Sequence, residues 1–333
     1  MNRRPTMNDV ARRAGVALKT VSRHVNGATN IDPALSTRIA QAIDELGYRR
    51  NLAAASIRPG WTTRTVGLII SDLGNPYFSA LARSIEAALS THGYLLTISS
   101  SNEDGATFDR LVDRLIEQQV DAIIAVPPRN AGRDWIDDMP ALPPVVFVDR
   151  PMSSSRADTV LADNEGGAKE AVLALLASGA RRIAFLGDSL SIYTMGKRLA
   201  GYCAALEVSG LQVDDSLVSG AAHTIEDAVA VVEELLIGRD ADAVFAANNR
   251  AALGALFAFK LVGRRIRLVG FDDFESSMLS SPPVSVINQD IELMGRSVAA
   301  IVLDRINGGS VNEPLVLRTE LILRGSETPP KPL

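Results

Sequence analysis

The stretch from Val16 to Asn26 combines side-chain types and spacing that suit contact with the edges of DNA bases. Val16, Val21 and Val25 recur on one face of a helix, so the remaining side chains point outward. Lysine and arginine near the start of such a helix can donate to guanine N7 and O6, while serine, threonine and asparagine reach phosphates. The sequence therefore predicts a DNA-reading helix whose outward residues are Leu18, Lys19, Ser22, Arg23 and Asn26.

Two further helices are predicted to position this reader. Thr6 and Asp9 form a capping box at the start of the first helix, and Gly15 supplies the turn into the reading helix. Asp32 and Pro33 then mark the start of a third helix, whose apolar stripe stops at Gly47. We expect a three-helix, helix-turn-helix headpiece that closes at about Tyr48.

Charge is distributed unevenly along the chain. The first 60 residues hold ten basic and four acidic residues, a net charge of +6. The whole chain carries −5, so the remainder carries −11. This asymmetry predicts a polyanionic partner at the N-terminal part only.

Composition sets further bounds. With 333 residues, of which 47% are hydrophobic, the chain can form a large core and two or three compact units. No apolar run approaches the roughly 20 residues of a membrane helix, and no signal-peptide core follows the N-terminus, so neither membrane insertion nor export is expected. Cys203 is the only cysteine, which excludes an internal disulfide. We interpret it as a packing residue.

Beyond Gly60, short β-branched runs alternate with helical patterns, as parallel α/β sheets require. No dinucleotide or P-loop glycine motif follows any strand, so no nucleotide cofactor is expected. Four strands are predicted in a first half, Thr65–Ile70, Tyr94–Ser99, Ala122–Val126 and Val145–Asp149, and four in a second, Val160–Asp163, Ile183–Gly187, Ala243–Ala247 and Ile266–Gly270.

The headpiece resembles that of the LacI/GalR family of bacterial transcription regulators, and the similarity extends over essentially the whole chain. Leu46-Gly47-Tyr48 with residues 51–57 is similar to the family's hinge helix, and Val66–Ile70 with Asn75–Phe78 resembles the first strand and loop of its effector domain. Further similar segments are Asp149-Arg150, Asp163-Asn164, Arg182–Gly187, Arg198–Tyr202, Gly270–Asp273 and Leu323–Ser326.

The resemblance implies an organisation in three parts. Residues 1–49 would be the headpiece, 50–64 the hinge helix and linker, and 65–333 a periplasmic-binding-protein-like domain of two Rossmann-like subdomains. The N-subdomain would span about 65–162 plus 290–321, and the C-subdomain about 163–289 plus 322–330. By resemblance the chain would be a cytoplasmic homodimer that represses transcription from a pseudo-palindromic operator, under control of a carbohydrate-like effector bound between the subdomains.

We assign DNA contacts to eleven residues of the headpiece and hinge. Two departures from the family concern this part: Ala17 replaces a capping serine, and Arg50 replaces a proline before the hinge helix. Ile57 stands where the family has a leucine that enters the minor groove. The assigned residues are Thr6, Leu18, Lys19, Thr20, Ser22, Arg23, Asn26, Tyr48, Asn51, Ala54 and Ile57.

The effector site is expected at the carboxyl ends of the strands, where α/β sheets bind ligands. Amide, carboxylate and guanidinium groups there suit a hydroxylated ligand, and an aromatic face can stack on its ring. His223 departs from the family pattern and, with Arg129, Arg150 and Arg198, favours an acidic or phosphorylated sugar. Asn249 is a second departure, which replaces a carboxylate of the family by an amide that both donates and accepts and so argues against contact with an unmodified aldose. The candidate residues are Ser71, Phe78, Asp149, Arg150, Arg198, His223, Asn249, Asp273 and Gln289.

Two other classes of protein remain as alternatives. A transport-type sugar-binding protein would lack a role for the basic headpiece. An enzyme would need catalytic groups, and the sequence shows no Ser/His/Asp order and no metal-ligand cluster. A pair of cleft carboxylates, Asp149 and Asp273, could still hydrolyse a glycoside. We expect no catalytic residue, cofactor or metal.

Overall fold

The computed structural model describes residues 5–28, 30–49, 62–130, 136, 139, 142–152 and 154–329. The chain divides into two compact units, Met1–Thr63 and Arg64–Leu333. The hinge residues Arg50, Asn51, Ala54 and Ile57 lie outside the described residues, so their predicted roles stay predictions.

The first unit contains the three expected helices, α1 (Met7–Ala14), α2 (Leu18–Val25) and α3 (Pro33–Leu46). The capping box is confirmed, because the Thr6 hydroxyl accepts from the Asp9 amide and the Asp9 carboxylate accepts from the Thr6 amide. Gly15 and Gly47 end α1 and α3 with left-handed φ angles of 65° and 62°, as only glycine does at little cost. The Asp32 side chain caps α3.

A small apolar core holds these helices together. One side chain from each helix, Val10, Val21 and Ile39, is completely buried, and Tyr48 packs against the same cluster. The face of α2 opposite this core is therefore left to solvent.

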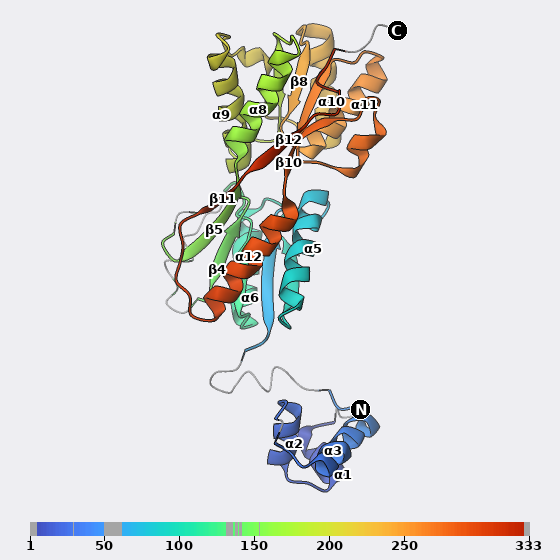
Figure 1. Cartoon of the computed structure of the whole chain (residues 1–333), viewed down its shortest axis with the longest axis vertical. Coiled ribbons are helices and arrows are strands. Elements are labelled where there is room, and N and C mark those ends of the chain that lie inside the picture. The colour runs from blue at the N-terminus through green and yellow to red at the C-terminus, as the bar shows by residue number, and fades with distance from the viewer. Residues whose placement is uncertain are drawn as a thin grey trace. The chain divides into compact units, whose positions relative to one another are not determined.

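The second unit consists of two sheets covered by helices, in which neighbouring strands are parallel except for β10 and β12, which are antiparallel (Figure 1). The first sheet has the order β11-β5-β4-β3-β1-β2, and the second has the order β12-β10-β9-β8-β6-β7. No helix within the described ranges is long and apolar enough to span a membrane. The strands are β1 (Thr65–Ile70), β2 (Leu95–Ser100), β3 (Ala122–Ala125), β4 (Val145–Val148), β5 (Ala157–Ala162), β6 (Ile183–Leu186), β7 (Val218–Ser219), β8 (Ala243–Ala246), β9 (Arg267–Phe271), β10 (Ser285–Gln289), β11 (Leu315–Leu317) and β12 (Thr319–Ile322).

Helices cover both faces of each sheet, because the side chains of buried strands alternate between two cores. Val66 and Leu68 of β1 pack on one side, where α5 and α12 lie, whereas Ile69 packs on the other side with α6. In the second sheet α8 and α9 cover one face, and α10 and α11 cover the other (Figure 1). The helices are α5 (Pro76–Ser90), α6 (Gly105–Glu117), α8 (Asn164–Ala177), α9 (Tyr193–Val208), α10 (Ile225–Gly238), α11 (Asn249–Val262) and α12 (Ile291–Ile306), with the 3-10 helices η1 (Asp215–Leu217) and η2 (Glu275–Leu279).

The chain passes between the two sheets after β5, after β10 and after β11. The prediction that Val160–Asp163 opens the second half is wrong, since β5 pairs with β4 in the first sheet. The boundary predicted at about 321/322 lies a few residues too late, because Thr319 already pairs with Gln289 in the second sheet. The hydrophobic pattern of a segment indicates that a strand is buried but not which strand it pairs with. The assignment of strands to the two sheets therefore required the structure. We call the two halves the first and second subdomains.

The missing cap on α2 yields a testable prediction. Ala17 makes no side-chain hydrogen bond at the start of this helix, although its backbone is extended as a cap residue requires. Ala17→Thr should add the missing acceptor and stabilise α2 by about 1 kcal/mol, or about fivefold in amide protection. Hydrogen exchange of the α2 amides in the full chain measures this. Ala17→Val, which has the same shape without the oxygen, is the control; equal protection in both variants would contradict the expectation.

Candidate functional site

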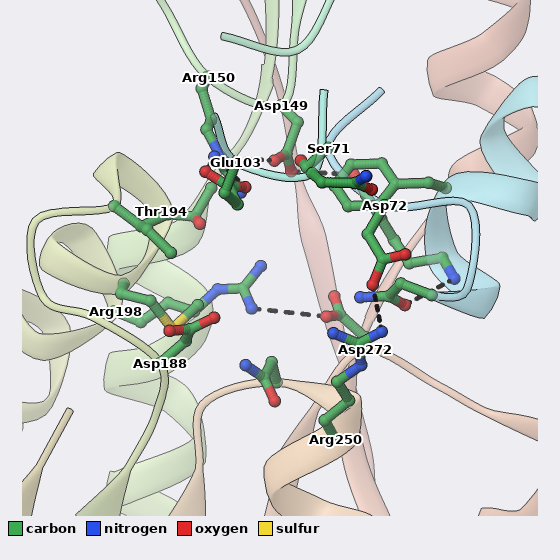
Figure 2. Close-up of a pocket in the computed structure, with 17 residues that line it drawn as sticks. Ser71, Asp72, Glu103, Asp149, Arg150, Asp188, Thr194, Arg198, Arg250 and Asp272 are labelled. Atoms are coloured by element: carbon green, nitrogen blue, oxygen red, sulfur yellow. Dashed lines mark hydrogen bonds and ion pairs between the residues drawn. The ribbon is translucent and has the colours of Figure 1, made fainter. Parts of the chain in front are cut away.

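A cavity of about 310 Å³ lies between the two sheets and is lined from both subdomains (Figure 2). Most of the lining side chains are polar or charged, and they lie in the loops that follow the strands or in the N-terminal parts of α5, α9 and α11. It consists of Ser71, Asp72, Asn75, Tyr77, Phe78, Asn102, Glu103, Asp149 and Arg150 from the first subdomain, and Asp188, Ile192, Thr194, Met195, Arg198, Asn248, Arg250 and Asp272 from the second.

Asp149 and Asp272 occupy equivalent positions in the two subdomains. Each directly follows a strand, and each donates its amide to the neighbouring strand, to Val160 at 3.0 Å and to Ile287 at 2.9 Å. Both have left-handed φ angles, 69° and 71°, which cost about 1 kcal/mol or more in a residue with a side chain. This backbone turn directs both carboxylates to the cavity.

Arg198 is the most constrained charge of the pocket. Its side chain is 3% exposed, its Nε donates to Asn164 Oδ1 at 2.8 Å, and its Nη1 donates to the carbonyl of Ala247 at 2.6 Å. The same Nη1 lies 3.5 Å from Asp272 Oδ2, and the guanidinium lies 3.6 Å from the centroid of the Phe271 ring. These contacts fix the guanidinium plane beside the cavity.

Tyr77 and Gln289 connect the two carboxylates behind the cavity. The Tyr77 hydroxyl donates to Asp149 Oδ1 at 3.1 Å and lies 3.5 Å from Gln289 Oε1, while Gln289 Nε2 donates to Asp272. Burial raises the pKa of the Asp149 carboxyl, although Arg150 and Arg198 act in the opposite direction. Burial and the neighbouring Asp149 charge also raise the pKa of Tyr77 well above its usual value, so its hydroxyl stays protonated.

Two buried polar atoms of the lining, the Ser71 hydroxyl and Arg150 Nε, have no hydrogen-bond partner among the described residues, and Arg150 Nε lies 3.4 Å from the Asp149 carboxylate. The Ser71 hydroxyl is buried, with the residue 2% exposed, and makes no hydrogen bond to the part of the chain that the structure describes. Buried hydroxyls are almost always satisfied, so an unpaired one that lines a cavity indicates a place for a ligand's polar atom. Phe78, whose ring is buried edge-on to Tyr77, lines the same cavity with apolar surface.

Five of the nine predicted effector residues lie in the lining: Ser71, Phe78, Asp149, Arg150 and Arg198. Gln289 lies behind them against Asp272. His223 lies outside the lining but pairs with Asp188, which belongs to it.

Two predictions missed the cavity by one residue. Asp273 does not line it; its carboxylate accepts from Arg324 at 2.6 and 2.8 Å, and Asp272 takes the place in the pocket. The reason is the left-handed φ of Asp272, which breaks the alternation of the strand before it. Asn249 donates to Asn75 at 2.9 Å, and Asn248 lines the cavity while capping α11.

Several lining residues were not predicted from the sequence, although they also lie at the carboxyl ends of strands, which was the criterion used for the other candidates. Asp72 and Glu103 follow β1 and β2, and Asp188 and Arg250 follow β6 and β8, all at the carboxyl edge of a sheet. Glu103 positions the predicted Arg150, because Glu103 Oε1 lies 2.7 Å from Arg150 Nη1.

The headpiece presents the outward face of α2 that the sequence predicted. Val21 is completely buried, while Lys19 and Asn26 are exposed and Leu18 is 44% exposed. Thr6 is also exposed, and Thr20 and Ser22 are half-buried. Arg23 is exposed and donates to Asn30.

Tyr48, unlike the other described residues predicted to contact DNA, is buried. It is 7% exposed and belongs to the headpiece core, because the chain turns back onto Ile43 after Gly47. The structure therefore gives its ring a packing role.

Both the headpiece and the two-sheet domain match known protein families. Residues 6–51 match the family described as bacterial regulatory proteins, lacI family, and residues 63–320 match the family of periplasmic binding proteins and the sugar binding domain of the LacI family. The transcriptional regulator CelR of Thermobifida fusca is 35% identical over 97% of this chain and 98% of its own length.

Solved structures show the same likeness. The CelR–cellobiose complex has 33% sequence identity and a TM-score of 0.72, and it covers 97% of this chain and 100% of the other. The Lac repressor dimer bound to operator and the anti-inducer ONPF has 25% identity and a TM-score of 0.86, over 98% of this chain and 100% of the other. This chain, with its helix-turn-helix headpiece and its two-sheet α/β domain, belongs to the LacI family of bacterial transcription regulators.

Proposed function

We propose that the chain represses transcription from an operator, and that its DNA affinity is set by a small neutral carbohydrate bound in the cavity between the two subdomains. The observation that carries the proposal is the arrangement around Ser71, a buried unpaired hydroxyl beside fixed carboxylate and guanidinium groups from both subdomains. Such groups form paired hydrogen bonds with vicinal hydroxyls. The cellobiose in the CelR complex supports a carbohydrate.

The charges of the lining favour a neutral ligand over the acidic or phosphorylated sugar suggested by sequence. Among the described lining residues there are five carboxylates and three guanidinium groups. Every one of these guanidinium groups already has a carboxylate partner: Arg150 with Glu103, Arg198 with Asp272, and Arg250 with Asp72. An anion entering the cavity would lose its hydration and meet an excess of negative charge.

Size points to a small sugar. A cavity of about 310 Å³ lies at the small end of the range for ligand pockets, about 300–1,000 Å³. It suits a mono- or disaccharide better than a longer chain.

The dimer in the Lac repressor–operator complex supports a homodimer on a pseudo-palindromic operator for this chain. Exposed apolar side chains of the second subdomain offer a surface for the second copy, since such patches usually mark an interface. They are Phe257 and Leu261 of α11 with Met278 and Leu279 of η2, and Leu279 is 86% exposed.

The other classes of function gain less support. The hydrolase alternative needs Asp149 and Asp273 to act together, and Asp273 is engaged by Arg324 outside the lining. The relatives are transcription regulators, and a transport protein has no use for a DNA-reading helix. We therefore propose a regulator without catalytic activity, which acts in the cytoplasm at the bacterial nucleoid.

A matched sugar titration tests the ligand class. Glucose and cellobiose should be compared with their 6-phosphates by calorimetry and by the thermal unfolding midpoint of the full chain. We expect binding and a raised midpoint only with neutral sugars, because each guanidinium group in the described lining already has a carboxylate partner and the carboxylates outnumber the guanidinium groups. Tighter binding of a phosphorylated member than of its neutral counterpart would overturn the proposal.

Substitution of Lys19 tests the DNA-reading face. Lys19→Ala should relax base preference at one position of each half-site, by about 1–3 kcal/mol of discrimination. Selection of random duplex DNA by both proteins, followed by sequencing, measures this. Lys169→Ala, which removes the same charge from α8, is the control. An unchanged base preference in the Lys19 variant would refute the assignment.

We expect the buried carboxylate of Asp149 to lower the free energy of unfolding of the ligand-free protein. Because the pKa of Asp149 is raised in the folded state, its contribution is most favourable at low pH and is lost as pH rises through the folded-state value. Asp149→Asn should therefore be more stable than the parent chain at pH 7, with a difference that shrinks on acidification, and should bind sugar more weakly.

Asp273→Asn is the control of opposite sign. Hydrogen bonds from Arg324 lower the pKa of Asp273, so this variant should be less stable than the parent at pH 7, and its deficit should also shrink as pH falls. Chemical unfolding from pH 4 to pH 8 measures both. A destabilised Asp149→Asn at pH 7 would contradict the account.

A further inference from the structure

Two polar contacts cross the cleft beside the cavity. Asp72, in the loop after β1 of the first subdomain, pairs with Arg250 in the first turn of α11 of the second. Asn249 Nδ2 donates to Asn75 Oδ1 at 2.9 Å between the same two segments. Figure 2 shows the Asp72 carboxylate directed toward the Arg250 side chain across the cavity.

These contacts bring the N-terminal ends of two long helices together. Asn75 is the N-cap of α5, where its Oδ1 also accepts from the Tyr77 amide at 3.1 Å, and Asn249 is the first residue of α11. Each helix end carries a partial positive charge of roughly half an elementary charge. Two such ends therefore meet at the cleft.

Arg250 adds a full positive charge at this point. An arginine in the first turn of a helix is unfavourable for that helix, because acidic residues are preferred there. The Asp72 carboxylate across the cleft compensates for it. Residues that break a local rule often serve another purpose, and here the only hydrogen bond found for the Arg250 side chain among the described residues is the one to Asp72.

Asp72 is thus a carboxylate among three positive groups. It accepts from Arg250 and, at 2.7 Å, from the amide of Gly74 just before α5. Burial alone would raise the pKa of Asp72, but these hydrogen bonds outweigh it and lower the pKa, so the group is charged at neutral pH.

We propose that Asp72 is an electrostatic latch: its charge allows the N-terminal ends of α5 and α11 and the Arg250 guanidinium to approach, and so holds the two subdomains closed around the cavity. Without that charge the positive groups repel one another across the cleft. The latch sets the ratio of closed to open cleft in the ligand-free protein; its effect on sugar affinity rests in addition on the proposed function.

The electrostatic latch and a simple hydrogen-bonded pair predict different results when the cleft opening of Asp72→Asn is compared with that of the double variant Asp72→Asn, Arg250→Gln. Asp72→Asn leaves Arg250 facing two helix ends, so it should open the cleft most. Adding Arg250→Gln to that variant removes the strongest of the repelling charges and should close the cleft again in part. If the pair acted only through its hydrogen bond, the double variant would be no more closed than the single one.

The test measures the separation of the subdomains directly, without sugar. Spin labels are placed at Arg114→Cys on α6 and Glu207→Cys on α9, both exposed positions, in the full chain with Cys203→Ser. Labelled protein is diluted into excess unlabelled protein, so that each dimer holds one labelled chain. Pulsed electron spin resonance then gives the distance distribution between the two labels.

We expect Asp72→Asn to lower the ratio of closed to open populations about fivefold or more, and the double variant to recover part of this loss. Asp273→Asn, which removes an ion pair within the second subdomain, should leave the distribution unchanged. An unchanged distribution in Asp72→Asn, or a double variant as open as Asp72→Asn, would overturn the latch. Because no sugar is present, this result stands apart from the sugar titration, whose failure would affect only the proposed ligand.

Discussion

The buried guanidinium of Arg198 is the constraint around which the cavity is organised. A charge removed from water must be compensated by hydrogen bonds and an opposite charge, or the fold is destabilised by several kcal/mol. Asn164, Ala247 and Asp272 provide that compensation from α8, from the end of β8 and from the end of β9. The need to satisfy Arg198 therefore fixes the loops that follow several elements, and with them the second subdomain's side of the pocket.

The same network reaches the connection between the subdomains. Asp272 also binds Gln289, the last residue of β10, from which the chain passes to α12 of the first subdomain. Gln289 in turn lies beside the Tyr77 hydroxyl, which binds Asp149. A ligand that engages Asp149 and Asp272 would thus act on groups that touch a connecting strand. We therefore expect occupancy of the pocket and the relative position of the subdomains to be linked.

Local sequence patterns predicted the helices and strands of this protein better than they predicted which strands pair with one another. The caps at Thr6, Asp32 and Gly47 are encoded within a few residues, so the headpiece helices followed from sequence. The pairing of β5 with β4, and of β12 with β10, depends on residues far apart, and no local pattern encodes it. Four strands of the structure, β7, β10, β11 and β12, were not predicted. β7 has only two residues and β11 is an exposed edge strand, so their sequence patterns are weak.

The candidate site shows the same division. The rule that ligands bind at the carboxyl ends of strands located Ser71, Asp149 and Arg150 correctly in the lining. It could not choose between Asp272 and Asp273, because that choice depends on a left-handed backbone angle. Nor could it reveal that Arg250 faces Asp72, since the two lie 178 positions apart and in different subdomains.

We expect occupancy of this pocket and binding of the operator to be coupled. The most direct measurement is the affinity of the full chain for a neutral sugar that it binds, determined by calorimetry with and without saturating operator DNA, beside the affinity for operator with and without saturating sugar. Thermodynamic reciprocity predicts the same factor, different from one, in both experiments. A sugar affinity that is identical with and without operator would contradict the account.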